Sequence, residues 1–455
     1  MLPLKIHPKN PHLLGSADGV EMFLLGDTAW QLLQRLSRDE IQYYLDNRAA
    51  KGFNLICTVF LSEFDGLRVP NQESHVPLDS FEPIQINAQY LDLVKFLLTE
   101  ANQRGIFVGL LPTWGDKMTA PWGIGPRIFE VGDEAKCFDF GKLLAEGLKD
   151  HSNILWVLGG DRPANLSKTA LDWPYPWQAG FTVDTDWEPL WRAMSQGIVQ
   201  VLPEALFAFH PQGGSLSTSQ LIHKSDWLDI NMIQSGHGGG HDIPIWDWIG
   251  RDYAMRPAKP TLDAEPNYED HPVSPWPTWD PASGYFDEYD VRKQCYRSVF
   301  AGGCGVIYGH HCVWQFWSEG REPIMWPQFD WKTALDRPGA HHVGQLRKLL
   351  NRFDQQVRMP DQSVFVRGQG SGAHAKCCMR TEDWQLVMIY LPMREALEIW
   401  IPTAPGTHYK LEWMSPINLV VQGESFVARP DQPFSIEPPE GLSPDVILIL
   451  SRVLT

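Results

Sequence analysis

The chain has 455 residues, 43% of them hydrophobic, and a formal net charge of −17. This length suits a (β/α)8 barrel with a small second domain, and the apolar content is sufficient for a large core. The negative charge argues against nucleic acids and anionic membranes as partners. No stretch approaches the roughly 18 consecutive apolar residues of a membrane-spanning helix. Neutral carbohydrates are compatible with all of these properties.

The first residues and the cysteines indicate the cellular compartment. The N-terminal sequence MLPLKIHPKNPHLL has no long apolar run after a basic start, so we predict no signal peptide. The seven cysteines are few for a chain of this size, and most lie in or beside apolar runs. This distribution favours buried free thiols over a disulfide framework. We therefore expect a cytoplasmic protein.

Residues 1–354 alternate between short apolar runs and helical segments. One predicted helix begins at Ser37, with Glu40 placed to complete a capping box, and ends at Gly52. The predicted strands cover residues 23–30, 53–61, 106–111, 154–158, 206–210, 228–233, 261–264 and 304–308. Eight strands are the number that a (β/α)8 barrel requires. A doubly wound open sheet is the alternative, but the sequence lacks a dinucleotide-binding glycine motif.

Residues 355–455 show a different pattern, with short alternating strands between Gly, Pro and Asn turns. The predicted strands here cover residues 363–367, 386–391, 397–401, 409–413, 426–429 and 446–450. This spacing is typical of an antiparallel β-sandwich. Trp384, Trp400 and Trp413 lie within the alternating strands, where aromatic residues ordinarily serve packing. We therefore expect a β-sandwich domain that braces the barrel and does not bind sugar independently.

Two predicted barrel strands end at carboxylates. The apolar run 154–158 leads into Gly159 and Gly160, which allow a sharp turn and leave Asp161 at the mouth of the strand. Glu265 follows the seventh predicted strand in the same way. Residues that follow the strands of such a barrel share one site at its C-terminal face. A carboxylate pair there is the machinery of glycoside hydrolysis.

The two carboxylates are predicted to have different roles. Desolvation beside an apolar strand would raise the pKa of Asp161, which favours it as the proton donor. Tyr268 and neighbouring imidazoles could keep Glu265 ionised as the nucleophile. Three alternatives remain open: the roles could be exchanged, Asp161 could serve only a turn or a helix cap, and Asp263 or, as the weaker rival, Glu269 could replace Glu265.

Polar and aromatic residues at the other strand ends are candidates for binding a sugar. The 20 tryptophans of the chain include many in Pro- and Gly-rich connections, and indole rings suit the apolar faces of sugars. The candidate substrate-binding residues are Asp27, Trp30, Glu63, Trp114, Arg162, His210, Gln234, His237, Tyr268, His310 and His311. The histidines could bind a metal, but neither a His-x-His motif after the first strand nor a metalloprotease helix motif is present. We therefore favour hydrogen bonds to sugar hydroxyls and expect no cofactor.

Four motifs together resemble the apiosidase-like family of glycoside hydrolases. They are GDTAW at residues 26–30, WVLGGDRP at 156–163, QSGH at 234–237 and EPNYE at 265–269. The resemblance covers essentially the whole chain. It implies a (β/α)8 barrel with a small C-terminal β-sandwich that is described as collagen-binding. The family's proposed catalytic pair, an aspartate after the fourth strand and a glutamate after the seventh, matches Asp161 and Glu265.

The characterised activity of this family is release of the branched pentose apiose from side chains of plant pectin. The resemblance therefore implies an exo-acting glycosidase that cleaves a terminal apiose-like sugar, and we predict a retaining mechanism. The loops 115–133, 162–186 and 270–289 are expected to select the sugar. A non-catalytic carbohydrate-binding barrel and a metal-dependent barrel hydrolase are the alternative functions.

Overall fold

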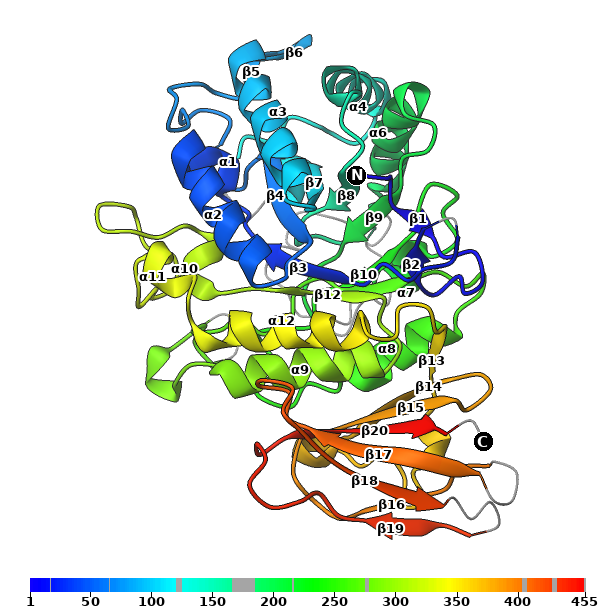
Figure 1. Ribbon diagram of the computed structural model, residues 1–455. Helices are drawn as coiled ribbons and strands as arrows, with labels where there is room; N and C mark the ends of the chain where they lie inside the picture. Colours follow the sequence, from blue (N-terminus) through cyan, green and yellow to red (C-terminus); the bar gives the residue numbers. More distant parts are fainter. Residues whose placement is uncertain are drawn as a thin grey trace.

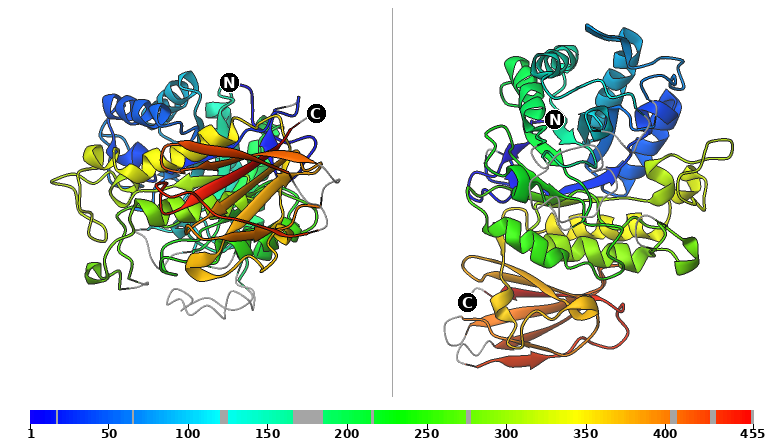
Figure 2. Two further views of the ribbon diagram at one scale, coloured as in Figure 1. Left: turned by 60° about the horizontal axis from the view of Figure 1, so that its bottom comes forward. Right: turned by 180° about the vertical axis from the view of Figure 1, so that it is seen from behind.

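The computed structural model of the protein describes residues 1–16, 18–64, 66–119, 125–165, 185–214, 217–274, 278–402, 407–427 and 432–453. A parallel sheet surrounded by helices occupies the larger part of the molecule (Figure 1). A smaller antiparallel domain lies below it and contacts it at helix α9 (Glu288–Phe300), and Figure 2 gives two further views of this arrangement.

The parallel sheet is an eight-stranded barrel. Its strands are β3 (Leu24–Thr28), β4 (Leu55–Leu61), β7 (Phe107–Thr113), β8 (Ile154–Gly159), β9 (Phe207–His210), β10 (Asn231–Ile233), β11 (Thr261–Asp263) and β12 (Gly305–Tyr308). They pair in the order β10-β11-β12-β3-β4-β7-β8-β9, and a parallel bridge between Ala208 and Ile230 joins β9 to β10. The predicted (β/α)8 fold is confirmed, and each predicted barrel strand overlaps an observed one.

Helices cover the outside of the barrel. They are α1 (Leu32–Arg35), α2 (Arg38–Ala50), α3 (Ala88–Gln103), α4 (Glu134–Leu148), α6 (Glu188–Val201), α7 (Thr218–Ile222), α8 (Ile245–Ala254), α9 (Glu288–Phe300), α10 (His311–Trp314), α11 (Trp331–Ala334) and α12 (Pro338–Leu350). Helix α2 begins with the predicted capping box of Ser37 and Glu40. Two hairpins lie outside the barrel and consist of β1 (Lys5–Ile6) with β2 (Leu14–Gly15) and β5 (Leu78–Phe81) with β6 (Ile84–Ile86).

Strand β4 shows why the sequences of the barrel strands are apolar at successive positions. Leu55, Cys57 and Val59 belong to the core cluster inside the barrel, whereas Ile56 and Phe60 belong to the cluster under the helices. Both faces are therefore covered. All seven cysteines are buried and free, as predicted. Within the described ranges, no helix combines the length and the apolar content needed to cross a membrane.

The C-terminal domain consists of antiparallel strands. They are β13 (Arg358–Pro360), β14 (Cys377–Thr381), β15 (Leu386–Leu391), β16 (Leu397–Ile399), β17 (His408–Met414), β18 (Val421–Val427), β19 (Phe434–Ile436) and β20 (Val446–Arg452). Six of them form a sheet in the order β13-β14-β15-β20-β17-β18, and β16 pairs with β19. A hydrophobic cluster with members from both sheets, including Leu397 of β16 and Leu448 of β20, holds them together.

Sequence patterns were less informative in this domain than in the barrel. The predicted strand at residues 363–367 is wrong, because residues 362–364 form a 3₁₀ turn that Asp361 caps. Strand β14 was not predicted, because it is almost fully buried on both faces and lacks alternation. The predicted strand at residues 426–429 overlaps the end of β18 and otherwise lies outside the described residues.

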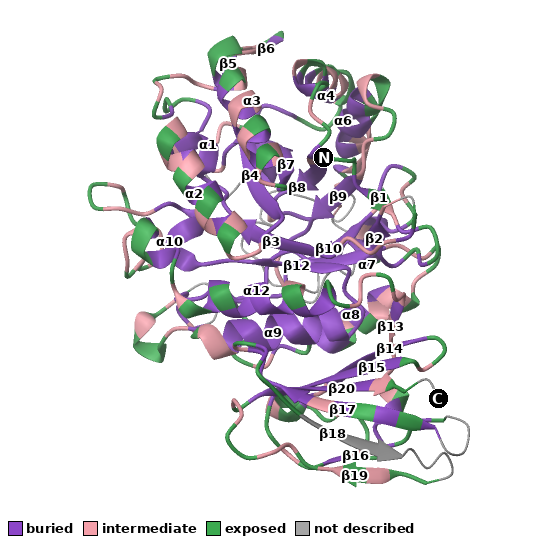
Figure 3. Cartoon of the chain, viewed as in Figure 1, coloured by how far each residue is buried: buried purple, intermediate pink, exposed green. Residues whose placement is uncertain are grey.

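Helix α9 lies between the barrel and the six-stranded sheet. Figure 3 shows it as buried over most of its length, and every residue from Asp290 to Phe300 is buried. Tyr296 stacks on Tyr390 of β15 with ring centroids 5.0 Å apart. Arg292 forms a buried ion pair with Asp445 at 2.8 Å. The two parts of the chain therefore share one core at this helix.

Candidate active site

The end of β8 turns sharply before Asp161. Gly159, Gly160 and Asp161 have φ angles of 88°, 109° and 56°, in the left-handed region. A Cβ atom at Gly159 would lie 2.3 Å from the carbonyl oxygen of His210, and one at Gly160 would lie 2.9 Å from the Trp114 ring. Only glycine fits at these two positions. The turn leaves the Asp161 side chain 26% exposed.

Glu265 lies just beyond β11 and is held by two imidazoles. Its Oε2 lies 3.1 Å from Nε2 of His210, and its Oε1 lies 3.1 Å from Nε2 of His237. The other nitrogen of each ring accepts a backbone hydrogen bond: Nδ1 of His210 from the Asp161 N–H, and Nδ1 of His237 from the Tyr268 N–H, both at 3.3 Å. With Nδ1 accepting, Nε2 carries the proton and faces the carboxylate.

These surroundings separate the pKa values of the two carboxylates. Burial favours a higher pKa for Glu265, but hydrogen bonds from His210 and His237 outweigh burial and lower the pKa to about 2. Burial raises the pKa of Asp161; the Arg162 guanidinium opposes this shift, and the Glu265 carboxylate adds to it. One group is therefore kept ionised, while the other is pushed toward the protonated form.

Asp263, the alternative to Glu265, does not face the site. Its carboxylate accepts hydrogen bonds from Ser235 at 2.7 Å and from Ser298 of α9 at 2.5 Å, and the residue is fully buried. Asp263 is the last residue of β11, so the strand alternation that would align it with Glu265 ends there. Asp263 therefore anchors the barrel to its helix layer.

Aromatic rings surround the two carboxylates. The Trp30 ring lies 5.1 Å from that of Trp114 and 5.3 Å from that of His210, both edge to face. The Tyr268 ring lies 4.3 Å from the His237 ring. Burial and the Glu265 carboxylate raise the pKa of Tyr268 well above its ordinary value, so this phenol stays protonated. Indole and phenol rings thus border the two carboxylates, and all of these aromatic residues are buried.

Charged groups gather on the Asp161 side of the site. The Arg162 side chain is fully buried; its Nη1 donates to the Asp161 carbonyl at 2.8 Å and lies 3.4 Å from Oδ2 of the same residue. Asp116 and Lys117, which the sequence analysis did not single out, form a buried ion pair at 2.7 Å. Burial raises the pKa of Glu63 to about 8, against the opposing effect of Arg162.

Most of the predicted site residues meet at this end of the barrel. Gln234 hydrogen-bonds to the Asp161 side chain. The residues that the structure brings together are Trp30, Glu63, Trp114, Asp161, Arg162, His210, Gln234, His237, Glu265 and Tyr268. Direct contact of these residues with a sugar stays a prediction.

Asp27 does not point into the site, which corrects the sequence prediction. Successive β3 side chains alternate between the two faces: Leu24 lies in the inner cluster and Leu25 in an outer one. Asp27 therefore faces outward, where it accepts hydrogen bonds from Tyr44 at 2.5 Å and from Arg48 at 2.6 Å. It stabilises the contact between β3 and α2.

Internal partners occupy the ring nitrogens of His310 and His311, which corrects the expectation that these nitrogens bind a sugar, although the His311 ring lies 4.7 Å from that of His271. Nε2 of His310 lies 3.0 Å from Asp270, and its Nδ1 accepts from the Cys312 N–H at 3.0 Å. Nε2 of His311 lies 2.6 Å from the Met325 carbonyl oxygen, and its Nδ1 accepts from Trp314 Nε1 at 3.4 Å. Both rings are fully buried and fix the loop after β12.

His271 and Trp279 extend the site; His271 was not predicted, and Trp279 was noted only as one of the tryptophans in Pro- and Gly-rich connections. The His271 ring stacks on His237 with centroids 4.3 Å apart and planes 15° apart. Trp279 meets His271 edge to face at 4.9 Å. Their only sequence signal was their place in the loop 270–289. Among the described residues, no group of three or more His, Cys, Asp or Glu side chains is arranged to hold a metal ion.

Comparisons with known proteins agree with this geometry. The family model described as "Apiosidase-like, catalytic domain" matches residues 8–356. A glycoside hydrolase family 5 protein from Bacteroides vulgatus ATCC 8482 is 27% identical, with a TM-score of 0.83 over 99% of this chain and 93% of that one. A second solved glycoside hydrolase is also 27% identical, with a TM-score of 0.81 over 99% and 97% of the two chains.

A third solved structure is described as a glycoside hydrolase candidate from the same Bacteroides strain. It is 14% identical, with a TM-score of 0.68 over 99% of this chain and 82% of that one, and it shares the fold. No curated protein matches the chain. The family match covers most of the chain, and the site contains the two carboxylates that glycoside hydrolysis needs. The protein is a glycosidase and belongs to the apiosidase-like family of glycoside hydrolases.

Proposed function

We propose that the protein is an exo-acting, retaining glycosidase that removes a terminal apiose-like pentose from plant-derived glycans. Glu265 is the nucleophile and Asp161 is the general acid and base. The observation that carries these roles is the separation of the two pKa values, lowered to about 2 for Glu265 and raised for Asp161. Such a difference between paired carboxylates marks which one attacks and which one donates a proton.

The low pKa of Glu265 favours a retaining reaction. An inverting enzyme needs a carboxylate that removes a proton from water, and a group with a pKa of about 2 is a weak base at neutral pH. The same group can attack a sugar carbon directly, because attack requires an ionised oxygen and not a strong base. Glu265 is therefore better suited to form a covalent glycosyl ester than to activate water.

The reaction has two steps. A Glu265 oxygen bonds to the anomeric carbon while the glycosidic bond breaks, and the Asp161 carboxyl gives its proton to the leaving oxygen. Asp161, now ionised, takes a proton from water, whose oxygen attacks the anomeric carbon and releases Glu265. In both steps His210 and His237 orient Glu265 through their Nε2 atoms.

The sugar is inferred from the family. The name of the matching model points to apiosidase activity, and apiose is a branched pentose of pectin side chains. Trp30 and Trp114 offer a surface for its apolar face. The loops 115–133, 162–186 and 270–289 are still expected to select the sugar, and residues 120–124, 166–184 and 275–277 of them lie outside the described residues.

Activity and stereochemistry test this proposal together. Purified protein is incubated with aryl glycosides of apiose, arabinose, xylose and glucose, and with pectic fragments, and the released monosaccharide is measured. We expect turnover of the apioside above the other sugars, and proton NMR at early times should show a product with the anomeric configuration of the substrate. An inverted product would contradict the role of Glu265, and preference for a hexoside would contradict the substrate.

A further inference from the structure

The catalytic glutamate is connected to the C-terminal domain through helix α9. We infer that this domain positions Glu265 by way of Arg297, which joins the domain to the loop that carries His237. The inference rests on the proposed function, because it concerns the nucleophile of that reaction. It gives residues 355–455 a part in catalysis that differs from binding sugar or collagen.

Arg297 contacts the domain through three backbone carbonyls. Its Nε donates to Ala375 at 2.9 Å, and its Nη2 donates to Gly372 at 2.8 Å and to Ala373 at 3.0 Å. The arginine is only 1% exposed. Its planar guanidinium can satisfy several acceptors in fixed directions, which a lysine ammonium cannot do.

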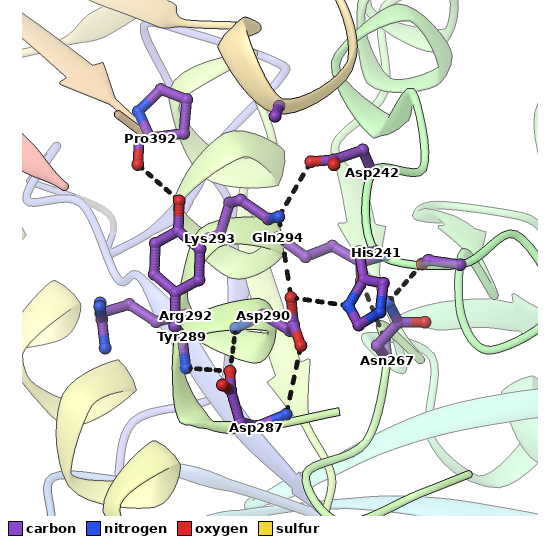
Figure 4. Close-up of polar contacts among 12 residues, drawn as sticks. His241, Asp242, Asn267, Asp287, Tyr289, Asp290, Arg292, Lys293, Gln294 and Pro392 are labelled. Atoms are coloured by element: carbon purple, nitrogen blue, oxygen red, sulfur yellow. Dashed lines mark hydrogen bonds and ion pairs between the residues drawn. The ribbon is translucent and has the colours of Figure 1, made fainter. Parts of the chain in front are cut away.

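The same guanidinium holds the end of the loop that follows β10. Nη1 of Arg297 donates to Asp242 at 2.9 Å, and Nζ of Lys293 lies 2.9 Å from the same carboxylate oxygen. Nδ1 of His241 lies 3.0 Å from the carboxylate of Asp290, which precedes Lys293 on α9 by about one turn. Figure 4 shows Asp242 and His241 both turned toward this face of the helix. Three α9 side chains therefore fix residues 241 and 242.

This loop also carries His237 and contacts the segment that carries Glu265. Asn267 donates to the Gly240 carbonyl at 3.0 Å, and its N–H donates to Gln294 of α9 at 3.0 Å. Gln294 in turn donates to Ser235 at 2.8 Å. Residues on both sides of His237 and beyond Glu265 are therefore bound to one buried helix, and a shift of α9 would change the His237–Glu265 contact.

The helix also contacts the domain at points that do not involve the loop. Tyr289 donates to the Pro392 carbonyl at 2.7 Å, a contact also drawn in Figure 4. Arg292 makes two hydrogen bonds of 2.8 Å to Asp445, and neither partner contacts residues 236–242. Arg292 and Arg297 are thus two buried arginines on one helix that bind the same domain, and only Arg297 also binds the loop. They form a matched pair for an experiment.

The experiment compares R297K with R292K in the full-length protein. Both changes keep the charge and remove a planar fork at the domain contact, so both should lower Tm. For R297K we expect kcat to fall roughly 10- to 100-fold with KM within about twofold, because the nucleophile is displaced. The acid limb of kcat/KM should also move to higher pH, since a weaker His237 hydrogen bond raises the pKa of Glu265. R292K should keep the wild-type kcat and pH profile.

A second variant tests the connection itself. D242N weakens the hold of Arg297 and Lys293 on the loop and leaves the domain contacts of Arg297 intact. It should lower kcat and move the acid limb of kcat/KM as R297K does. The R297K/D242N double variant should have a kcat only slightly below that of either single variant. Equal kcat in R297K and R292K, or fully additive losses, would overturn the inference.

The outcomes also separate this inference from the proposed function. Wild-type turnover that E265Q abolishes, together with wild-type kcat in R297K and D242N, would overturn the inference alone. Full turnover in E265Q, or no hydrolysis by the wild type, would overturn the proposed function and this inference with it.

Discussion

The ends of β11 and β8 each place one carboxylate in the site, but the surroundings of the two groups differ. Glu265 is only 8% exposed and faces two imidazoles whose tautomers are set by backbone N–H groups. Asp161 is 26% exposed and lies beside a cluster of charges: Glu63, Asp116, Lys117 and Arg162. Hydrogen bonds from the two imidazoles thus lower the pKa of Glu265 against the effect of burial, whereas burial raises the pKa of Asp161 and nearby charges of both signs modify that rise.

The proposed roles of the two carboxylates require different pKa values. A nucleophile must be ionised throughout the working pH range, and hydrogen bonds from enclosed donors provide that at any ionic strength. A general acid must give up its proton and recover it, so its pKa has to lie near the working pH. Burial together with nearby charges of both signs can set such an intermediate value.

The largest effect is expected at the glutamate. E265Q removes the nucleophile but keeps the size of the side chain and an oxygen that can accept from one histidine. Turnover of an aryl glycoside should fall about 10⁴-fold. Azide should restore part of it by attacking the sugar carbon in place of the carboxylate. Full activity in E265Q would remove Glu265 from the mechanism.

D161N should lose activity in a way that depends on the leaving group. For a poor leaving group, which needs protonation, we expect a loss of about 10²- to 10⁴-fold. A dinitrophenolate leaves without a proton, so the first step on that substrate should be nearly unaffected. Comparing the two substrates under single-turnover conditions measures this contrast, and equal losses on both would assign Asp161 a different role.

The donors to Glu265 should control the acid limb of the pH profile. H237F removes one hydrogen bond from the carboxylate, so the pKa of Glu265 should rise from about 2 and kcat/KM should begin to fall at higher pH on acidification. H237Q retains an N–H donor and should restore part of the wild-type profile. Identical acid limbs in the wild type and H237F would show that the imidazole does not keep Glu265 ionised.

The smallest effect is expected at Arg162. This cation holds the pKa of Asp161 below the value that burial would produce, so R162M should let that pKa rise and move the basic limb of kcat/KM to higher pH. R162K keeps the charge and should leave the limb near its wild-type position. A basic limb that R162M left at the wild-type pH would contradict this effect of Arg162 on Asp161.

The sequence by itself predicted the barrel and the two strand-end carboxylates that we propose as the catalytic pair. Strands buried on both faces must be apolar, so the runs before Asp161 and Glu265 could be recognised without coordinates, and two glycines marked the sharp turn before Asp161. His210 ends its strand and Gln234 directly follows its strand, so both could be recognised in the same way.

Only the tertiary structure decided which strand-end residues face the site and which serve the scaffold. Asp27 and His310 have the same sequence context as true site residues, but strand alternation and buried partners turn them away. His271 stacks on His237, and Arg297 binds Asp242, so both are connected to Glu265 only through contacts that folding creates. A sequence pattern records the environment of one segment, whereas a pKa depends on all the groups that folding brings around it.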